Sequence, residues 1–163
     1  MQIWVDADAC PNPIKEILFR AAERLQISMI LVANTLLRTP PSPLVRAMRV
    51  RRGFNVADRE IVDQVQTGDV VVTADIPLAA EVIGRGGHAL DPRGVLYTQE
   101  NIPERLAVRN LMAELRATGL ATGGPAPWSR EDNRAFANQL DRLLSAAVKP
   151  EAKPTLRGQE GSE

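Results

Sequence analysis

Residues 3–13 have the sequence IWVDADACPNP, in which an apolar run leads directly into two carboxylates, Asp6 and Asp8. A small-residue turn follows, and then Asn12 and Pro13, a pair typical of a helix start. The pattern predicts a buried strand with acidic groups at its carboxyl end, which is the edge where open α/β sheets bind ligands. In an extended chain the two carboxylates point to one side. They would repel one another unless a cation or a proton lies between them.

The composition is that of one ordinary globular domain with a substantial core. The chain has 163 residues, 44% apolar and 25% charged, and a formal net charge of +0, so its overall charge gives no general attraction to nucleic acid or anionic membranes. The single cysteine, Cys10, excludes an internal disulfide framework and favours a reducing compartment. No apolar run is long enough to span a membrane, and Asp6 interrupts any signal peptide early, so we expect a cytoplasmic protein.

The order of the predicted elements is that of a parallel α/β sheet. A strand over 2–6 precedes an amphipathic helix from Asn12 onward and a buried strand over 29–33, which together predict a parallel unit with a right-handed crossover. The further predicted elements are a loop over 34–43, a helical turn or two over 43–50, a short strand over 54–56, a helix that Asp58 caps, a strand over 69–73, a helix opened by Pro77 and a short strand over 88–90.

The C-terminal part of the sequence shows helices alone. One predicted helix has an apolar face over 108–115, and another has a capping arrangement over 129–132 and an apolar face over 136–147. Residues 149–163 contain Pro, Gly and charge with one large apolar residue, and we expect a disordered tail there. The sequence therefore predicts a single three-layer α/β domain over 1–148, with a parallel sheet and added C-terminal helices.

Acidic residues follow every predicted strand except the second, so a parallel arrangement would bring carboxylates to one edge of the sheet. They are Asp6, Asp8, Asp58, Asp75 and Asp91. Asp is also a good helix cap and turn residue, which is the alternative role for Asp58 and for Asp91. A capping role is less well indicated for Asp75, because Ile76 separates it from Pro77. Asp6 and Asp8 cannot both cap a helix that begins at residue 13.

A set of carboxylates on one edge favours a divalent metal ion. Like charges a few ångströms apart raise one another's pKa, and hard cations with oxygen ligands, Mg²⁺ or Mn²⁺, offset that cost. Such a site can activate a water molecule and stabilise charge on a phosphoryl group. We therefore predict a metal-dependent phosphoryl-transfer or phosphodiesterase site. Asp6, Asp8, Asp58 and Asp75 are its catalytic and metal-binding residues, and Asp91 is a further candidate ligand.

Several stretches also resemble the bacterial YaiI/YqxD family. They are residues 3–11 (IWVDADACP), 69–79 (DVVVTADIPLA), 89–94 (ALDPRG), 97–102, 123–125 (GGP) and 136–142. The resemblance implies a PIN-like nuclease fold, in which acidic residues gather around Mg²⁺ or Mn²⁺ and RNA is the usual substrate. By this resemblance Asp6 matches the acid after the first strand, Asp58 the middle acid and Asp75 the acid after the Val-Val-Thr strand. Arg59 stands where a further paired acid is expected, which bears on the presence of a second metal ion.

A run of arginines without an intervening acid is a candidate contact for a nucleic-acid backbone, because Arg pairs well with phosphate. It comprises Arg38, Arg46, Arg49, Arg51 and Arg52, of which the last four are the predicted RNA contacts. The alternative is a solvated helix face. Aromatic residues do not interleave with these arginines, which disfavours a stacking platform for single strands.

Two other functions remain open beside the metal-dependent nuclease. An aspartyl-phosphate phosphatase would use Asp6 as nucleophile and Asp8 as acid or base, but the chain has no lysine between Lys15 and Lys149 to balance the phosphate. A PIN-like module that binds RNA or a protein without catalysis is the other.

Two further residues with reactive side chains are expected to have no catalytic role. Cys10 is expected to be a small buried residue rather than a reactive thiol, and His88 to be structural.

Overall fold

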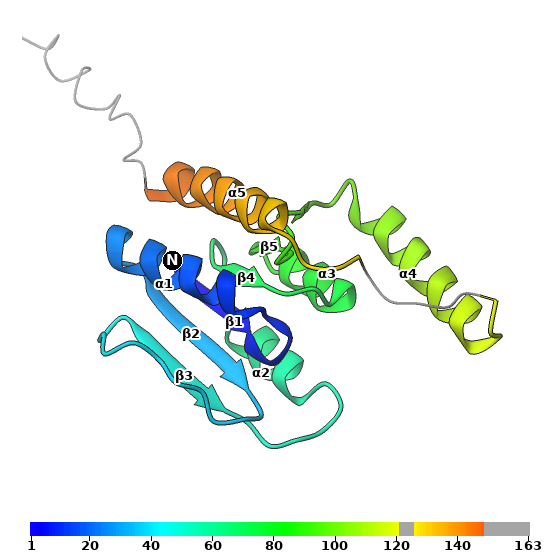
Figure 1. Cartoon of the computed structure of the whole chain (residues 1–163), viewed down its shortest axis with the longest axis horizontal. Coiled ribbons are helices and arrows are strands. Elements are labelled where there is room, and N and C mark those ends of the chain that lie inside the picture. Colours follow the sequence, from blue (N-terminus) through cyan, green and yellow to red (C-terminus); the bar gives the residue numbers. More distant parts are fainter. Residues whose placement is uncertain (121–125, 149–163) are drawn as a thin grey trace, which may run out of the picture.

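The computed structural model describes residues 1–120 and 126–148 (Figure 1). The segment 121–125, which contains the Gly-Gly-Pro stretch, and the predicted tail over 149–163 lie outside the described residues.

A six-stranded sheet forms the centre of the fold. Its strands are β1 (Gln2–Asp6), β2 (Ser28–Ala33), β3 (Val45–Arg49), β4 (Val70–Val72), β5 (His88–Leu90) and β6 (Leu96–Tyr97). They lie in the order β3-β2-β1-β4-β5-β6, and all neighbours are parallel except β5 and β6, which form an antiparallel hairpin. The predicted parallel unit of β1 and β2 is confirmed, with Gln2 opposite Ser28 and Asp6 opposite Val32.

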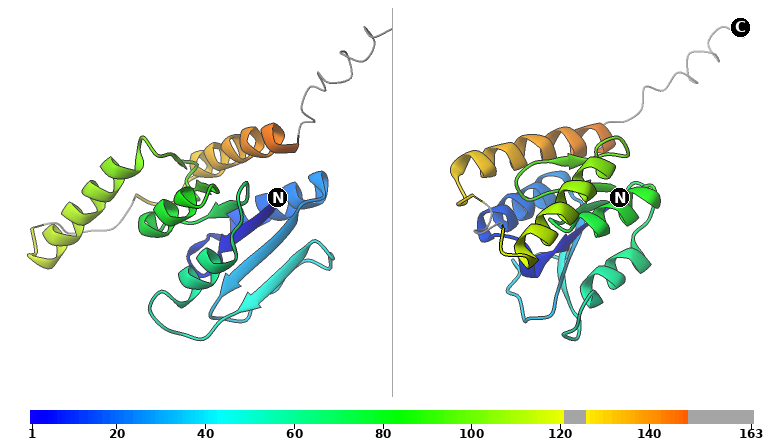
Figure 2. Two further views of the ribbon diagram at one scale, coloured as in Figure 1. Left: turned by 180° about the vertical axis from the view of Figure 1, so that it is seen from behind. Right: turned by 90° about the vertical axis from the view of Figure 1, so that its right-hand side faces the viewer.

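Helices cover both faces of the sheet, so the predicted three-layer α/β architecture is confirmed (Figures 1 and 2). The helices are α1 (Asn12–Leu25), α2 (Val56–Gln64), α3 (Ile76–Gly84), α4 (Ile102–Ala117) and α5 (Arg130–Val148), with the short 3-10 turn η1 (Ala7–Ala9) after β1. Helices α1 and α5 pack together on one face, and α2 and α3 cover the other. Helix α4 contacts α3 and extends beyond the sheet.

The alternation of side chains along β1 divides the core between these two faces. Ile3 and Val5 pack under α1 and α5, whereas Trp4 packs under α2 and α3. The indole Nε1 of Trp4 donates a hydrogen bond of 3.1 Å to Asp69 Oδ2, and the amide of Gln2 donates one of 2.9 Å to Asp69 Oδ1. Asp69 is a buried carboxylate whose role is structural, because it fixes the start of β1 against the start of β4.

Two predicted elements between β2 and α2 are wrong. Residues 43–50 were expected to be helical, but Val45–Arg49 form the edge strand β3, which pairs with β2. Residues 54–56 were expected to be a strand, but the chain turns there and α2 begins at Val56. For residues 45–49, pairing with β2 determined the structure rather than local propensity. Residues 54–56 have no strand partner in the described part of the chain, and Asn55 with φ +63° forms the N-cap of α2 instead.

The helix ends and the C-terminal region differ from the sequence-based predictions in smaller ways. Pro11, not Asn12, occupies the N-cap of α1, and Asn12 is the first helical residue. The hairpin strand β6 was not predicted. The cap of α5 is confirmed: the amide of Ser129 donates to Asp132 Oδ2 at 3.1 Å, and the amide of Asp132 donates to the Ser129 hydroxyl at 3.4 Å. The apolar face of α5 is buried at Phe136, Leu140 and Leu144.

Helix α4 has the predicted apolar face, but the structure leaves much of it in solvent. Ile102, in its first turn, is buried against the α2–α3 side of the core, whereas Val108 and Leu111 are each 54% exposed. The difference arises because only the first turns of α4 reach the body of the protein.

A close approach at Gly94 holds α5 against the hairpin of β5 and β6. Gly94 has φ +94°, and a Cβ there would lie 2.6 Å from the backbone carbonyl carbon of Ala135. We expect Gly94→Ala to lower the free energy of unfolding by about 1–3 kcal/mol, as overpacking does, in chemical denaturation. Gly68→Ala is the matched control, because Gly68 has φ +89° but nothing within 4 Å of its Cβ position. An equal loss in both variants would mean that backbone strain, not the clash with α5, is responsible.

Candidate active site at the carboxyl ends of β1 and β4

The strand order of the sheet reverses between β1 and β4. From β1 the chain proceeds outward through β2 to β3, and it then returns to place β4 on the other side of β1. At such a point the connections leave in opposite directions and open a crevice at the carboxyl ends of the strands, where α/β proteins bind ligands. Asp6 is the last residue of β1, and Thr73 and Asp75 follow β4.

Thr73 links the two acids that follow these strands. Its hydroxyl donates a hydrogen bond of 3.0 Å to Asp6 Oδ2 and accepts one of 3.0 Å from the backbone amide of Asp75. Thr73 is 1% exposed, whereas Asp6 and Asp75 are half-buried, so the two acids reach the solvent from a buried link. Thr73 was not among the residues predicted from the sequence. The feature of the sequence that could have indicated its role is a hydroxyl residue placed between a buried strand and an acid.

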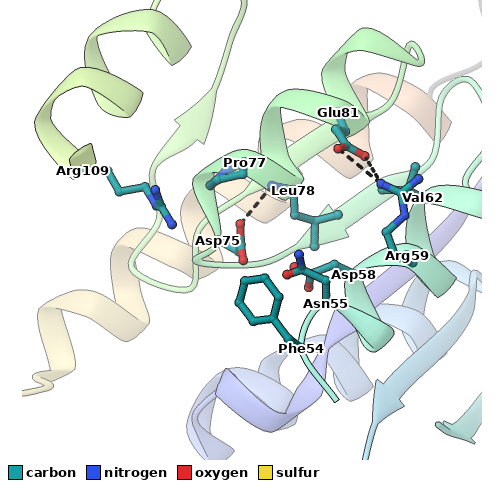
Figure 3. A pocket seen from close by; sticks show the side chains of 10 residues that line it. All are labelled: Phe54, Asn55, Asp58, Arg59, Val62, Asp75, Pro77, Leu78, Glu81 and Arg109. Atoms are coloured by element: carbon teal, nitrogen blue, oxygen red, sulfur yellow. Dashed lines mark hydrogen bonds and ion pairs between the residues drawn. The ribbon is translucent and has the colours of Figure 1, made fainter. Parts of the chain in front are cut away.

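Asp75 caps α3 and also faces Asp58. Its Oδ1 accepts a hydrogen bond of 3.0 Å from the amide of Leu78, so Asp75 caps α3 even though Ile76 separates it from Pro77. Asp58 lies in the first turn of α2, not at the end of a strand, and Asn55 occupies the N-cap position of that helix. The carboxyl groups of Asp58 and Asp75 are neighbours across the site, near enough for a hydrogen bond when Asp58 holds a proton (Figure 3).

The crowding of acids changes their proton affinity. Burial, followed by the negative charge of Asp75 and the hydrogen bond to it, raises the pKa of Asp58 from 3.8 to about 7. The charges of Asp6 and Glu81 act in the same direction. Burial also raises the pKa of Asp6, against the lowering effect of the Thr73 hydrogen bond, and Asp75 and Asp8 add to the rise. Without a cation, Asp58 and Asp75 therefore do not both carry a full negative charge at acidic to neutral pH.

Asp8 and Asp91 have their carboxylates engaged elsewhere. Asp8 accepts hydrogen bonds from the amide of Asn34 at 2.8 Å and from the hydroxyl of Thr35 at 3.1 Å, so it ties the turn after β1 to the end of β2. Asp91 accepts from the amide of Arg93 at 2.6 Å and from the hydroxyl of Tyr97 at 3.1 Å, as a residue of the β5–β6 turn does.

The structure thus places the five predicted carboxylates in three settings. Asp58 and Asp75 face each other, Asp6 lies beside them through Thr73, and Asp8 and Asp91 serve adjoining loops. Among residues 1–120 and 126–148, no three His, Cys, Asp or Glu side chains are grouped closely enough to form a complete metal-binding cluster. The metal ligands named from the sequence, including Asp91, therefore stay a prediction.

An open pocket of about 160 Å³ lies over the Asp58–Asp75 pair. Its lining includes Phe54 ahead of α2, Arg59 on α2, Glu81 on α3 and Arg109 on α4 (Figure 3). Arg59 forms an ion pair of 3.3 Å with Glu81. Phe54 was assigned to a strand in the sequence analysis, and Arg109 was not singled out because nothing in the sequence indicates that α4 reaches the site. The pocket is acidic at its base and has cations on its rim.

The four arginines predicted to contact RNA do not form one continuous patch. Arg46 and Arg49 lie three residues apart on the edge strand β3, so their side chains leave opposite faces of the sheet. Arg49 pairs with Ala33 at the carboxyl end of β2, and Arg51 and Arg52 follow in the exposed turn toward α2, whereas Arg46 lies in the middle of β3. Three of the four are therefore at the same edge of the sheet as the carboxylates. Their contact with RNA stays a prediction.

Cys10 and His88 contribute no chemistry to this site. Cys10 is buried, and burial raises the pKa of its thiol to about 12, so it is a protonated packing residue at neutral pH. His88 is exposed at the beginning of β5, the end of that strand opposite to the carboxyl edge.

The donor set fits a hard divalent cation. Mg²⁺ is typically bound through one or two carboxylates, with water and substrate phosphate completing its coordination. Asp58 and Asp75 provide two carboxylates held face to face, and burial together with the negative charge of Asp75 raises the pKa of Asp58. If a cation binds there, Asp6, beside the pair, would be a further oxygen ligand or a contact to coordinated water.

Comparison with known proteins identifies the family. The model of a family described as "Uncharacterized BCR, YaiI/YqxD family" matches residues 4–146. The chain belongs to the YaiI/YqxD family. Relatives named "UPF0178 protein" are similar to it along almost their whole length. That of Dechloromonas aromatica (strain RCB) is 65% identical over 145 residues, 89% of this chain and 97% of the relative. That of Shewanella amazonensis is 61% identical over 149 residues, 91% of this chain and 100% of the relative.

The similarities show the family of this YaiI/YqxD protein and no activity. No solved structure matches the chain. Within the part of the chain that the structure describes, no helix is both long and apolar enough to cross a membrane.

Proposed function

We propose that this YaiI/YqxD protein is a nuclease that depends on Mg²⁺ or Mn²⁺ and hydrolyses phosphodiester bonds, with RNA as the favoured substrate. The observation that supports this proposal is the facing pair Asp58 and Asp75, in which the pKa of Asp58 rises to about 7. Mutual repulsion destabilises two carboxylates in this arrangement, and a bound dication would offset that repulsion. The position of the pair at the reversal of strand order gives a substrate access to it.

Each side chain of the site has a separate task in this proposal. Asp58 and Asp75 would hold the cation, which when bound supplies a Lewis acid for the phosphoryl group and lowers the pKa of a coordinated water. Asp6, oriented by the Thr73 hydroxyl, would accept a proton from the attacking water, and its raised pKa suits that role. Arg109 on the rim would contact a phosphate of the substrate.

The proposal is tested by cleavage of end-labelled substrates. Single-stranded RNA, single-stranded DNA and duplexes of both are incubated with the full-length chain in Mn²⁺, in Mg²⁺ and in excess chelator. We expect metal-dependent cutting that the chelator abolishes and that is faster for RNA than for DNA. Cutting that persists in chelator, or no cutting of any substrate in either metal, would contradict the proposal.

A binding module without catalysis is the second candidate. It is favoured by the ion pair between Arg59 and Glu81, because an arginine stands where a further acid would complete a larger metal cluster. Metal binding and RNA binding without turnover would support this second function.

The phosphatase alternative has less support. It requires Asp8 to donate and accept protons beside Asp6, but Asp8 accepts hydrogen bonds from Asn34 and Thr35 on both of its oxygens. These bonds direct the carboxylate toward the loop after β2.

A further inference from the structure

Phe54 is an exposed aromatic residue at the edge of the candidate active site. Its side chain is 94% exposed, more than any other large apolar residue among those described. It lines the same pocket as Asp58 and Asp75 and lies beside them (Figure 3). No packing within the described chain therefore accounts for the position of this ring.

The backbone on both sides of Phe54 directs it outward. Gly53 has φ +155° and Asn55 has φ +63°, and Asn55 is the N-cap residue of α2. Because α2 is fixed to the core through the buried residues Ile61 and Val62, the turn has a defined position relative to Asp58. The ring is thus exposed on a short turn that is anchored to the same helix as one of the two facing acids.

Arginines lie near this ring in the chain and in the pocket. Arg51 and Arg52 precede it in the same exposed turn, and Arg109 on α4 lines the opposite rim of the pocket. An aromatic face with cations nearby complements a nucleotide strand, in which bases alternate with negatively charged phosphates. A base within a duplex has both faces covered by neighbouring base pairs, so only an unpaired base offers a face to the ring.

We propose that Phe54 is a stacking platform for an unpaired base, and that Arg109 contacts a phosphate next to that base. The occupant is a single-stranded nucleic acid, whose stacked base places the neighbouring phosphodiester over Asp58 and Asp75. This subsite rests on the proposed function and deepens it, because it selects single strands over duplexes. Phe54 is a positioning residue and takes no part in the chemical step.

The test measures equilibrium binding of a short fluorescein-labelled single-stranded RNA by anisotropy. Binding is measured in Ca²⁺, which takes oxygen ligands, so that cleavage and affinity are studied apart. We expect Phe54→Ala to raise the Kd by about 5- to 150-fold, the effect of losing one stacked base, and Phe54→Trp to stay within about twofold of the parent. Leu120→Ala is the control, because Leu120 is 79% exposed and does not line this pocket.

An oligonucleotide with abasic sugars separates stacking from charge. It should bind the parent more weakly than the normal strand does, and its Kd should be the same for the parent and for Phe54→Ala. The inference is overturned if Phe54→Ala leaves the Kd of the normal strand unchanged or weakens the abasic strand equally. Equal loss in Leu120→Ala, equal affinity of the parent for a duplex, or no binding at all would also overturn it.

Failure of this subsite is distinguishable from failure of the proposed function. If the parent cuts nucleic acid in Mn²⁺ but binding is insensitive to Phe54, the subsite is wrong and the nuclease remains. If binding depends on Phe54 but neither metal supports cutting, the subsite is supported and the chain is a binding module.

Discussion

Asp75→Asn is expected to lower the rate of Mn²⁺-dependent phosphodiester cleavage by at least about 100-fold, since loss of groups that only orient metal ligands costs 10–100-fold. The substitution removes one of two facing carboxylates and leaves the shape of the side chain. Asn caps helices about as well as Asp, so its side-chain oxygen can still accept the hydrogen bond from the Leu78 amide at the start of α3. The fold should therefore stay intact, and the thermal unfolding midpoint should be unchanged or higher because a repulsion is relieved.

The measurement compares single-strand cleavage by the parent, by Asp75→Asn and by Asp63→Asn under one set of conditions. Asp63 is an exposed acid on α2 and provides the same chemical change outside the pocket. Asp63→Asn should cut at the parental rate. Equal cutting by the parent and Asp75→Asn would assign the activity to a contaminant or to another site on the chain.

Mn²⁺ affinity is expected to rise steeply with pH up to neutrality and then level off. Below its pKa of about 7, Asp58 holds a proton that a metal ion must displace, so each lower pH unit weakens binding about tenfold. Above that pKa the proton is already absent. The apparent Kd should therefore fall by about 90-fold between pH 5 and pH 8 for one displaced proton.

Calorimetry in two buffers of different ionisation enthalpy measures the protons released on binding. We expect about one proton per Mn²⁺ at pH 5.5 and almost none at pH 8.5. Asp58→Asn should bind the metal more weakly at high pH and lose the pH dependence. A parental Kd that is constant from pH 5 to 8 would show that Asp58 does not share a proton with Asp75 in the free protein.

The Asp58 carboxyl also makes the stability of the metal-free protein depend on pH, and the direction of that dependence follows from its raised pKa. The pKa of Asp58 is raised on folding, so the native state binds more protons than the unfolded state between pH 4 and 7. Its contribution to stability is therefore present at pH 4 and is lost as the pH rises through 7.

The parts of the fold that are evident from the sequence are those with strong local patterns. The strand before Asp6, the amphipathic helix from Asn12 and the Val-Val-Val strand before Thr73 have periodicity, length and turn residues that agree with one another. Residues 43–56 have no clear apolar periodicity, and there both the predicted helix and the predicted strand were wrong. The edge position of β3 is a property of the sheet, which local sequence does not encode.

The residues of the candidate site also fall into those that local sequence patterns predict and those that they do not. The strand endings alone predicted that Asp6 and Asp75 lie at one edge of the sheet, because parallel strands bring their carboxyl ends together, and the structure places both acids there. Asp58 was predicted from the wrong element, and it reaches the site through the first turn of α2. Thr73, Phe54 and Arg109 were missed, because their roles depend on which side chains meet across elements distant in the sequence.

The pairing of β1 with β4 determines when the site can form during folding. Strands β1, β2 and β3 are consecutive neighbours, whereas the hydrogen bond between Thr73 and Asp6 joins residues 67 positions apart. Contacts between distant residues require closure of a long loop, which is slow relative to local pairing. A nascent chain that has folded only β1, β2 and β3 holds Asp6 without Thr73, Asp75 or Asp58. The acidic pair is thus assembled only when the second half of the sheet has docked, and metal affinity would report complete folding.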